Sequence, residues 1–170
     1  MRQLLLVLLC VAAITATLAA GWADGSTKGW PIFRGAWFTV KYPPGFVVTP
    51  REPGATTTGT RPDGVSFGSP GGKVEFYVYS PQWSGTSQWI KPRPGESLID
   101  KKTEESDRRK VTHVTLKGVS GSYRRVYIDT LDKLSNTRTV FGIKYWGEGA
   151  YQQYRAQYLL FKQSLVQFTD

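Results

Sequence analysis

The chain has 170 residues and a formal net charge of +9 at pH 7, from 22 Lys and Arg against 13 Asp and Glu. It contains one cysteine and one histidine, which excludes disulfide-rich scaffolds and the usual Cys/His ligand sets for zinc. Neither an EF-hand loop nor a phosphate-binding Gly-rich motif occurs in the sequence. We therefore expect no metal and no cofactor.

The N-terminus has the pattern of a secretory signal peptide. Arg2 supplies one positive charge, residues 4–20 form an apolar run, and small residues end it at Ala20. This pattern predicts export and cleavage before Gly21. The alternative is an uncleaved membrane anchor, because the 17 apolar residues fall just short of the ~20 that a spanning helix needs.

Cleavage would leave one domain without cysteine, because Cys10 is the only cysteine and lies within residues 1–20. The roughly 150 remaining residues suffice for one hydrophobic core and are too few for two substantial ones. Residues 21–35 contain several glycines and no periodicity, which indicates a loosely packed arm before a domain at 36–170. A cysteine-free exported domain suits a bacterial periplasm or the cell exterior.

The excess of Lys and Arg indicates which partners the protein attracts. Export excludes nucleic acid and leaves an anionic envelope component, another envelope protein or a membrane surface as the counterpart. Acidic residues are interleaved with basic ones in the segment DKKTEESDRRK at 100–110. Solubility alone is therefore the alternative explanation of the charge.

Alternating polarity predicts strands in the first half of the domain. Residues 36–42 alternate with a period of two, and residues 46–49 form a second extended piece before a Thr-, Gly- and Pro-rich loop at 51–64. Residues 65–68 and 73–80 flank the sequence Ser-Pro-Gly-Gly. Two apolar runs around such a turn predict a β-hairpin.

The second half predicts a four-stranded antiparallel meander. Its strands are expected at residues 97–106, 108–118, 122–130 and 137–146. A helix at 97–106 is an alternative, although the apolar residues there do not recur at helical spacing. The last strand offers apolar residues to both faces, as a central strand covered on both sides would.

A long helix is expected at residues 150–168. Its large apolar side chains recur at spacings of three and four and so form one stripe. We expect this stripe to cover the sheet. The stripe consists of Tyr151, Tyr154, Tyr158, Phe161, Leu165 and Phe168.

One catalytic motif occurs in the sequence. Residues 64–68 match the G-x-S-x-G pattern of the serine-hydrolase nucleophile elbow at Ser66, and Asp100 and His113 follow in the order that such hydrolases use. The elbow requires a strand before the serine and a helix after it, whereas here a loop leads in and a hairpin turn leads out. We therefore do not expect an enzyme.

A candidate binding surface lies on the strand at 122–130. Alternation places Tyr123, Arg125 and Tyr127 on one face, where rings and a forked donor suit recognition of carboxylate or phosphate. The alternative is a structural role in cross-strand pairs. The candidate partners for such pairs are Lys144, Glu75 and Tyr79.

Two tryptophans lie in the Pro-rich segment at 81–97. Exposed, Trp83 and Trp89 would suit stacking on sugars, aromatic rings or a membrane interface. Folded back, they would pin the segment to the sheet. The sequence leaves both alternatives open.

The order of these features resembles a known group. The motif F-x-V-x-Y-P-x-G-F at residues 38–46, a hairpin ending in YVYSP, a strand meander and a closing Y-x-x-F/Y helix resemble the PsbP-like domains of the Mog1/PsbP fold. The hairpin and the four-stranded meander predict an α+β fold with an antiparallel sheet of about six to eight strands, and the resemblance implies that this sheet lies within an α/β/α sandwich. It also implies a non-enzymatic accessory or binding role, as in the extrinsic subunit of photosystem II, and it supplies no site residue.

The sequence therefore predicts an exported, non-enzymatic binding or accessory protein of the bacterial cell envelope. The two alternatives are a small secreted hydrolase that uses Ser66 and a membrane-anchored structural domain of the envelope.

Overall fold

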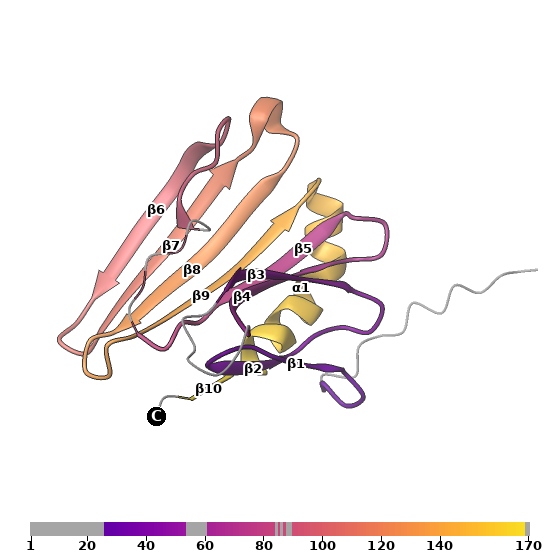
Figure 1. Cartoon of the computed structure of the whole chain (residues 1–170). Helices are drawn as coiled ribbons and strands as arrows, with labels where there is room; N and C mark the ends of the chain where they lie inside the picture. The colour runs from indigo at the N-terminus through magenta and orange to yellow at the C-terminus, as the bar shows by residue number, and fades with distance from the viewer. Residues whose placement is uncertain (1–25, 54–60, 84, 86, 88–89, 169–170) are drawn as a thin grey trace, which may run out of the picture.

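The computed structural model describes residues 26–53, 61–83, 85, 87 and 90–168 (Figure 1). These residues form two antiparallel sheets and one α-helix, which confirms the predicted α+β class. The large sheet has seven strands, in the spatial order β3 (Val47–Pro53), β4 (Pro62–Gly68), β5 (Val74–Tyr79), β9 (Thr137–Tyr145), β8 (Arg124–Asp132), β7 (Arg109–Lys117) and β6 (Ser97–Glu105). The small sheet consists of β1 (Ile32–Arg34), β2 (Phe38–Lys41) and β10 (Val166–Gln167), and the helix is α1 (Glu148–Gln163).

The predicted hairpin and meander are both present. Strands β4 and β5 pair around a turn in which Gly71 (φ 78°) and Gly72 (φ 68°) adopt the left-handed conformation that glycine tolerates. Strands β6 to β9 pair consecutively, with one irregularity between Leu98 and Asp100. Strand β5 then pairs with β9, with Phe76 opposite Ile143, and so joins the two halves into one sheet.

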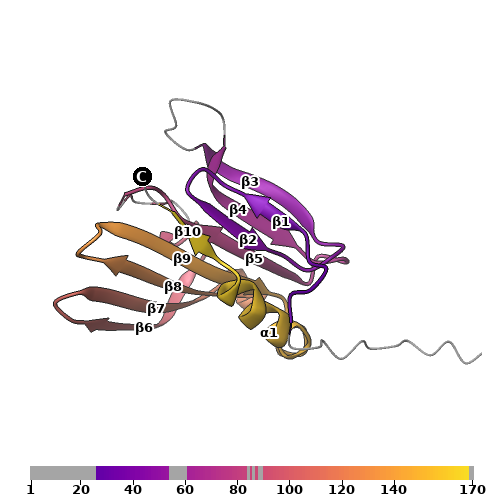
Figure 2. The ribbon, with the colours of Figure 1, turned by 90° about the horizontal axis from the view of Figure 1, so that it is seen from below.

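One face of the large sheet is covered by α1 and the small sheet together, as Figure 2 shows. Phe161 of α1 is completely buried there. Its ring centroid lies 5.4 Å from that of Phe67, 5.5 Å from that of Phe76 and 5.7 Å from that of Phe141. The main core of the protein is therefore an aromatic layer between α1 and the central strands.

The opposite face carries a smaller apolar cluster, made by Tyr77, Tyr79, Val114, Leu116, Tyr127 and Val140. Ile90 packs against this cluster. Residues 90–96, which we call the strap, run in front of this face in Figure 1. The resemblance implied a helical layer on each side of the sheet, but the residues that the structure describes include one α-helix, and the strap lies on the second face.

The helix ends earlier than expected. It stops at Gln163 rather than at residue 168, and the Ser164 hydroxyl accepts a hydrogen bond from the Lys41 amide (2.9 Å). The chain then forms β10, which pairs with β2. Within the predicted stripe, Leu165 still packs on the core from beyond the helix, whereas Phe168 is exposed. Pairing with the free edge of β2 thus overrides helical periodicity.

Part of the predicted arm is built into the domain. Strand β1 (Ile32–Arg34) pairs with β2, and Phe33 and Trp30 pack against the main core. The loosely packed arm expected at 21–35 is therefore corrected for its last residues. The predicted signal peptide lies outside the described residues.

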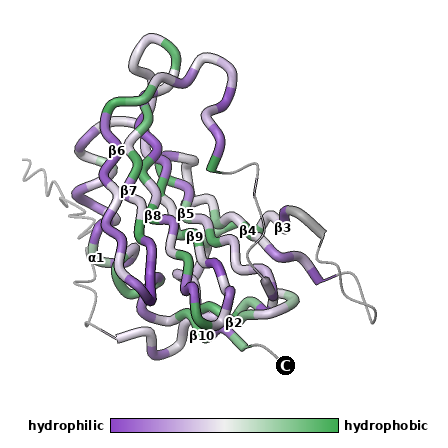
Figure 3. Tube along the Cα trace, turned by 90° about the vertical axis from the view of Figure 1, so that its left-hand side faces the viewer, coloured by the Kyte–Doolittle hydropathy of each residue, from purple (hydrophilic) through white to green (hydrophobic). Residues whose placement is uncertain are grey.

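The β6 edge of the large sheet is exposed to solvent, whereas the centre of the sheet is covered on both faces. All nine residues of β6 are exposed, and the hairpin that joins β6 to β7 is largely hydrophilic in Figure 3. At the centre, β9 presents Ile143 to the main core and Val140 to the smaller cluster. The prediction that this strand is covered on both faces is confirmed.

Candidate functional site

The face beneath the strap gathers most of the polar side chains that the sequence singled out. Strand register places Arg125 of β8 beside Lys144 of β9, and Lys144 beside Glu75 of β5. Two residues further along these strands, Tyr127 and Tyr77 flank Gly142. A Cβ at position 142 would overlap the Tyr77 ring, so glycine is required for Tyr77 to lie across β9.

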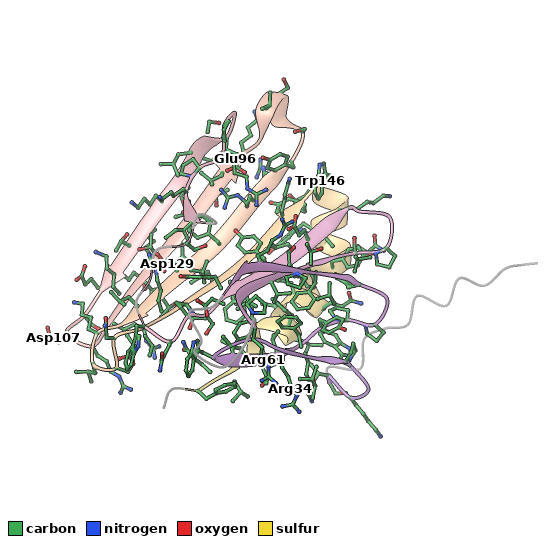
Figure 4. The ribbon with its side chains drawn as sticks, viewed as in Figure 1. Arg34, Arg61, Glu96, Asp107, Asp129 and Trp146 are labelled. Carbon is green, nitrogen blue, oxygen red and sulfur yellow. The ribbon has the colours of Figure 1, made fainter. Side chains whose placement is uncertain are left out.

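Arg125 and Glu96 form a buried ion pair between the sheet and the strap. Their side chains are 1% and 0% exposed. Glu96 Oε1 accepts hydrogen bonds from Arg125 Nε and from the Tyr123 hydroxyl (both 2.9 Å), while Oε2 accepts from Arg125 Nη2 and from the Arg93 amide (2.9 Å). Both carboxylate oxygens are thus fully used, and Figure 4 places Glu96 toward one end of the sheet.

Further hydrogen bonds attach the strap, and Gly85 before it, to the same face. The Tyr127 hydroxyl donates to the Ile90 carbonyl (2.6 Å), and Arg125 Nη2 donates to the Lys91 carbonyl (2.9 Å). Arg138 pairs with Asp129 and donates to the Gly85 carbonyl (2.6 Å). Backbone carbonyls therefore hold this segment, and the pattern of residue types in the sequence could not identify them.

The pKa values of Glu96, Arg125 and Tyr77 reflect how strongly these buried side chains interact. Burial disfavours the charged form of Glu96, but the hydrogen bonds outweigh this effect and lower its pKa from 4.5 to about 2. Burial likewise opposes the charge of Arg125, yet the contacts with Glu96 and Tyr77 raise the pKa of its guanidinium. Burial raises the pKa of the Tyr77 hydroxyl. The ion pair is therefore charged at neutral pH and fastens the strap.

The stability of the protein in acid should depend on this carboxylate. Because the pKa of Glu96 is lowered from 4.5 to about 2, its ionised form stabilises the folded state above pH 4.5, and this contribution is lost as the pH falls to 2. We expect the urea midpoint of the wild-type protein to fall across this range by more than that of Glu96→Gln. Glu104, Glu105 and Asp132, whose pKa values are also lowered, contribute equally to both proteins. Parallel curves for the two proteins would contradict the role of Glu96.

The predicted surface of Tyr123, Arg125 and Tyr127 is thus brought to one face, but most of it is covered. Arg125 is 1% exposed and Tyr127 is 6% exposed. This burial corrects the expectation that these two side chains offer an exposed surface, because they hold the strap instead. A binding role for the half-buried Tyr123 stays a prediction.

The structure describes one of the two predicted tryptophans. Trp83 is 53% exposed, and Trp89 lies outside the described residues. A stacking role for these residues stays a prediction.

A cation lies over two neighbouring aromatic rings beside the strap. The Lys144 ammonium is 3.9 Å from the centroid of the Tyr123 ring and 4.5 Å from that of the Trp146 ring. No ion pair joins Lys144 to a carboxylate among the described residues. Trp146 is 38% exposed, and it lies toward the same end of the sheet as Glu96 in Figure 4. Sequence reasoning treated Lys144 only as a pairing partner and gave Trp146 no binding role.

Trp146 also lines a pocket of about 250 Å³ on the same face. Its other walls include the exposed Val47 and Arg51 and the half-buried Glu75, and Ser66 lines it as well. Space is available here because Gly68, which has no side chain, lies in register between Val47 and Glu75. The pocket offers the Trp146 ring, apolar contact from Val47 and Val74, and charges of both signs.

The proposed hydrolase residues do not meet. Ser66 lies on β4 opposite Tyr77, on the strap face, whereas His113 on β7 lies opposite Ile128, on the other face. Three strands separate β4 from β7, which corresponds to about 19 Å at ~4.8 Å per strand. Asp100 shares the face of His113 rather than that of Ser66. The geometry required of a Ser-His-Asp triad is absent from these three residues.

The described residues contain no cluster of three or more His, Cys, Asp and Glu side chains that could hold a metal ion. None of their helices has the length and apolar character needed to cross a membrane.

No protein-family model matches the sequence, and a comparison with curated proteins finds no match either. The structure is similar to that of cyanobacterial PsbP (CyanoP) from Synechocystis sp. PCC 6803, with a TM-score of 0.50 and 11% identity over 87% of this chain and 96% of that chain. It also matches the Ran-binding protein Mog1p of Saccharomyces cerevisiae, with a TM-score of 0.40 and 11% identity over 82% of this chain and 97% of that chain. The match along nearly all of the cyanobacterial chain shows that this protein has the PsbP/Mog1-like fold.

Proposed function

We propose that this protein is an exported, non-enzymatic binding or accessory protein of the bacterial cell envelope, and that it binds at the Trp146 end of the strap face. The observation that carries the proposal is the Lys144 ammonium, which lies over the Tyr123 and Trp146 rings beside a pocket of about 250 Å³. Both rings are uncharged, so contact with them does not cancel the positive charge of Lys144.

The chemistry of this surface favours an anionic ligand with an apolar or ring-shaped part. Lys144 supplies a cation at one side of Trp146, and Arg51 supplies another in the pocket. Val47, which is 66% exposed, and Trp146 supply apolar contact. The formal net charge of +9 attracts anions over a longer range. Anionic envelope lipids combine these properties.

Export is the part of the proposal that rests on the N-terminal sequence. The apolar run at 4–20 follows Arg2 and ends in small residues, as in a signal peptide. N-terminal sequencing of the exported protein decides between cleavage before Gly21 and retention of the run as an anchor.

Binding to vesicles tests the proposed surface. We expect the protein to sediment with phosphatidylglycerol vesicles and not with phosphatidylcholine vesicles, and Lys144→Ala to weaken binding about fivefold, since one lysine at such a surface contributes ~1 kcal/mol. Added salt should weaken binding further. The matched control is Lys28→Ala, which removes the same charge at an exposed position.

Two results would contradict the proposal. One is the absence of binding by the wild-type protein to anionic vesicles. The other is an equal loss of binding in Lys144→Ala and Lys28→Ala, because net charge alone would then explain the attraction. A urea midpoint for each variant excludes unfolding as the cause.

A further inference from the structure

Strand β6 (Ser97–Glu105) forms an exposed edge of the large sheet. Among the described residues it pairs with β7 alone, and all nine of its residues are exposed. From Asp100 to Glu105 the pairing is regular and contains neither proline nor glycine. Such an edge presents a row of backbone N–H and C=O groups to another strand.

The side chains of β6 have a symmetric charge pattern. Two lysines, Lys101 and Lys102, precede Thr103, and two glutamates, Glu104 and Glu105, follow it. In an antiparallel pair of identical strands centred on Thr103, Lys101 faces Glu105 of the second copy and Lys102 faces Glu104. Because the arrangement is two-fold symmetric, each of these pairs occurs twice.

The two kinds of pair lie on opposite faces of the sheet. Lys101 is opposite Val114 of β7, whose side chain belongs to the strap-side cluster, and Lys102 is opposite His113, which points to the other face. A two-fold axis perpendicular to the sheet keeps the corresponding faces of both copies together. Cross-strand neighbours of opposite charge therefore meet on both faces.

We propose that two copies of this chain associate through their β6 edges, in the antiparallel register centred on Thr103, to form one continuous sheet. A shift by two residues is the smallest that keeps each side chain on its face, and it places Lys102 opposite Lys102 or Glu104 opposite Glu104. Charged residues on an edge usually prevent pairing with other strands. In β6 the order of the charged residues disfavours the shifted registers and favours the register centred on Thr103.

The charges of β6 are only weakly engaged within one copy. Lys102 Nζ lies 2.7 Å from Glu104 Oε1, with the two side chains 69% and 61% exposed, and Glu105 contacts Lys110 and Lys133 at the surface. Exposed ion pairs of this kind contribute little to stability. A second strand can replace them with equivalent pairs and adds backbone hydrogen bonds. This association is independent of the proposed binding surface at Trp146.

Charge reversal gives a test that does not depend on folding, because both positions are exposed. We expect the wild-type exported protein to show a concentration-dependent monomer–dimer equilibrium in sedimentation velocity. Lys102→Glu and Glu104→Lys should each raise the dimer dissociation constant about tenfold or more, since like charges then face each other twice. An equimolar mixture of the two variants should dimerise as the wild type does, because every facing pair is again opposite in charge.

Cross-linking fixes the register. Thr103→Cys should form a disulfide-linked dimer under mild oxidation, because residue 103 faces itself across the axis at a distance that a disulfide spans. The matched control is Lys101→Cys, which lies about 13 Å from its counterpart at ~3.3 Å per residue and should not cross-link. A wild type that stays monomeric at its highest soluble concentration, a mixture that fails to dimerise, or equal cross-linking at both positions would each overturn the proposal.

Discussion

Replacing Glu96 by alanine is expected to lower the free energy of unfolding by about 3–5 kcal/mol. The substitution leaves the Arg125 guanidinium, which is 1% exposed, without the carboxylate that accepts two of its hydrogen bonds. It also removes the acceptor of the Tyr123 hydroxyl. Urea denaturation at pH 7 measures the change.

Two further variants separate the ion pair from the general effect of losing a carboxylate. Glu104→Ala removes an exposed partner of Lys102 and should leave the free energy of unfolding nearly unchanged, because exposed ion pairs contribute little to stability. The double variant Arg125→Met/Glu96→Leu removes both buried charges and should recover most of the stability, because the desolvation cost of each charge disappears with it. A Glu96→Ala variant as stable as Glu104→Ala would show that the strap is not fastened by this pair.

Phe161→Ala is the second substitution with a large expected effect, a loss of about 3–5 kcal/mol in the free energy of unfolding. The Phe161 side chain is completely buried, and its ring contacts rings from both α1 and the sheet. Alanine would leave a cavity at the point where the helix meets the central strands. Urea or thermal unfolding measures the loss.

The control for this substitution lies on the same helix. Leu159 is 42% exposed, so Leu159→Ala removes a similar apolar side chain without opening a cavity. Its cost should stay below about 1 kcal/mol, within the range of ordinary surface substitutions. Similar losses for the two variants would mean that α1 is attached to the sheet by something other than the Phe161 layer.

The predictions for Glu96 and Phe161 concern the two faces of the large sheet. Different kinds of interaction hold the covering segments on these two faces. On the helix face, apolar area removed from water supplies the stabilisation. On the strap face, a charged pair and backbone carbonyls do so, and such contacts require specific geometry. The strap face is consequently where charge and exposed aromatic rings remain at the surface, and where we place the proposed binding site.

The candidate site was only partly visible in the sequence. Alternation along β8 identifies Tyr123, Arg125 and Tyr127 as members of one face, because side chains alternate in every strand. It does not reveal that Glu96, twenty-nine positions from Arg125, supplies a carboxylate to the same face. The Pro-Gly-Glu sequence before β6 carries no periodic signal, and so the burial of Arg125 could not be anticipated.

Local sequence patterns account for the parts of this protein that depend on neighbours along the chain. The hairpin of β4 and β5, the meander of β6 to β9 and the helical stripe around Phe161 all follow from local periodicity and turn chemistry. Three features follow instead from long-range contacts in the folded chain: the pairing of β5 with β9, the end of α1 at Gln163 and the burial of Arg125 under the strap. Each of these depends on a partner distant in sequence, whose hydrogen bonds and charges outweigh local preference once the chain has folded.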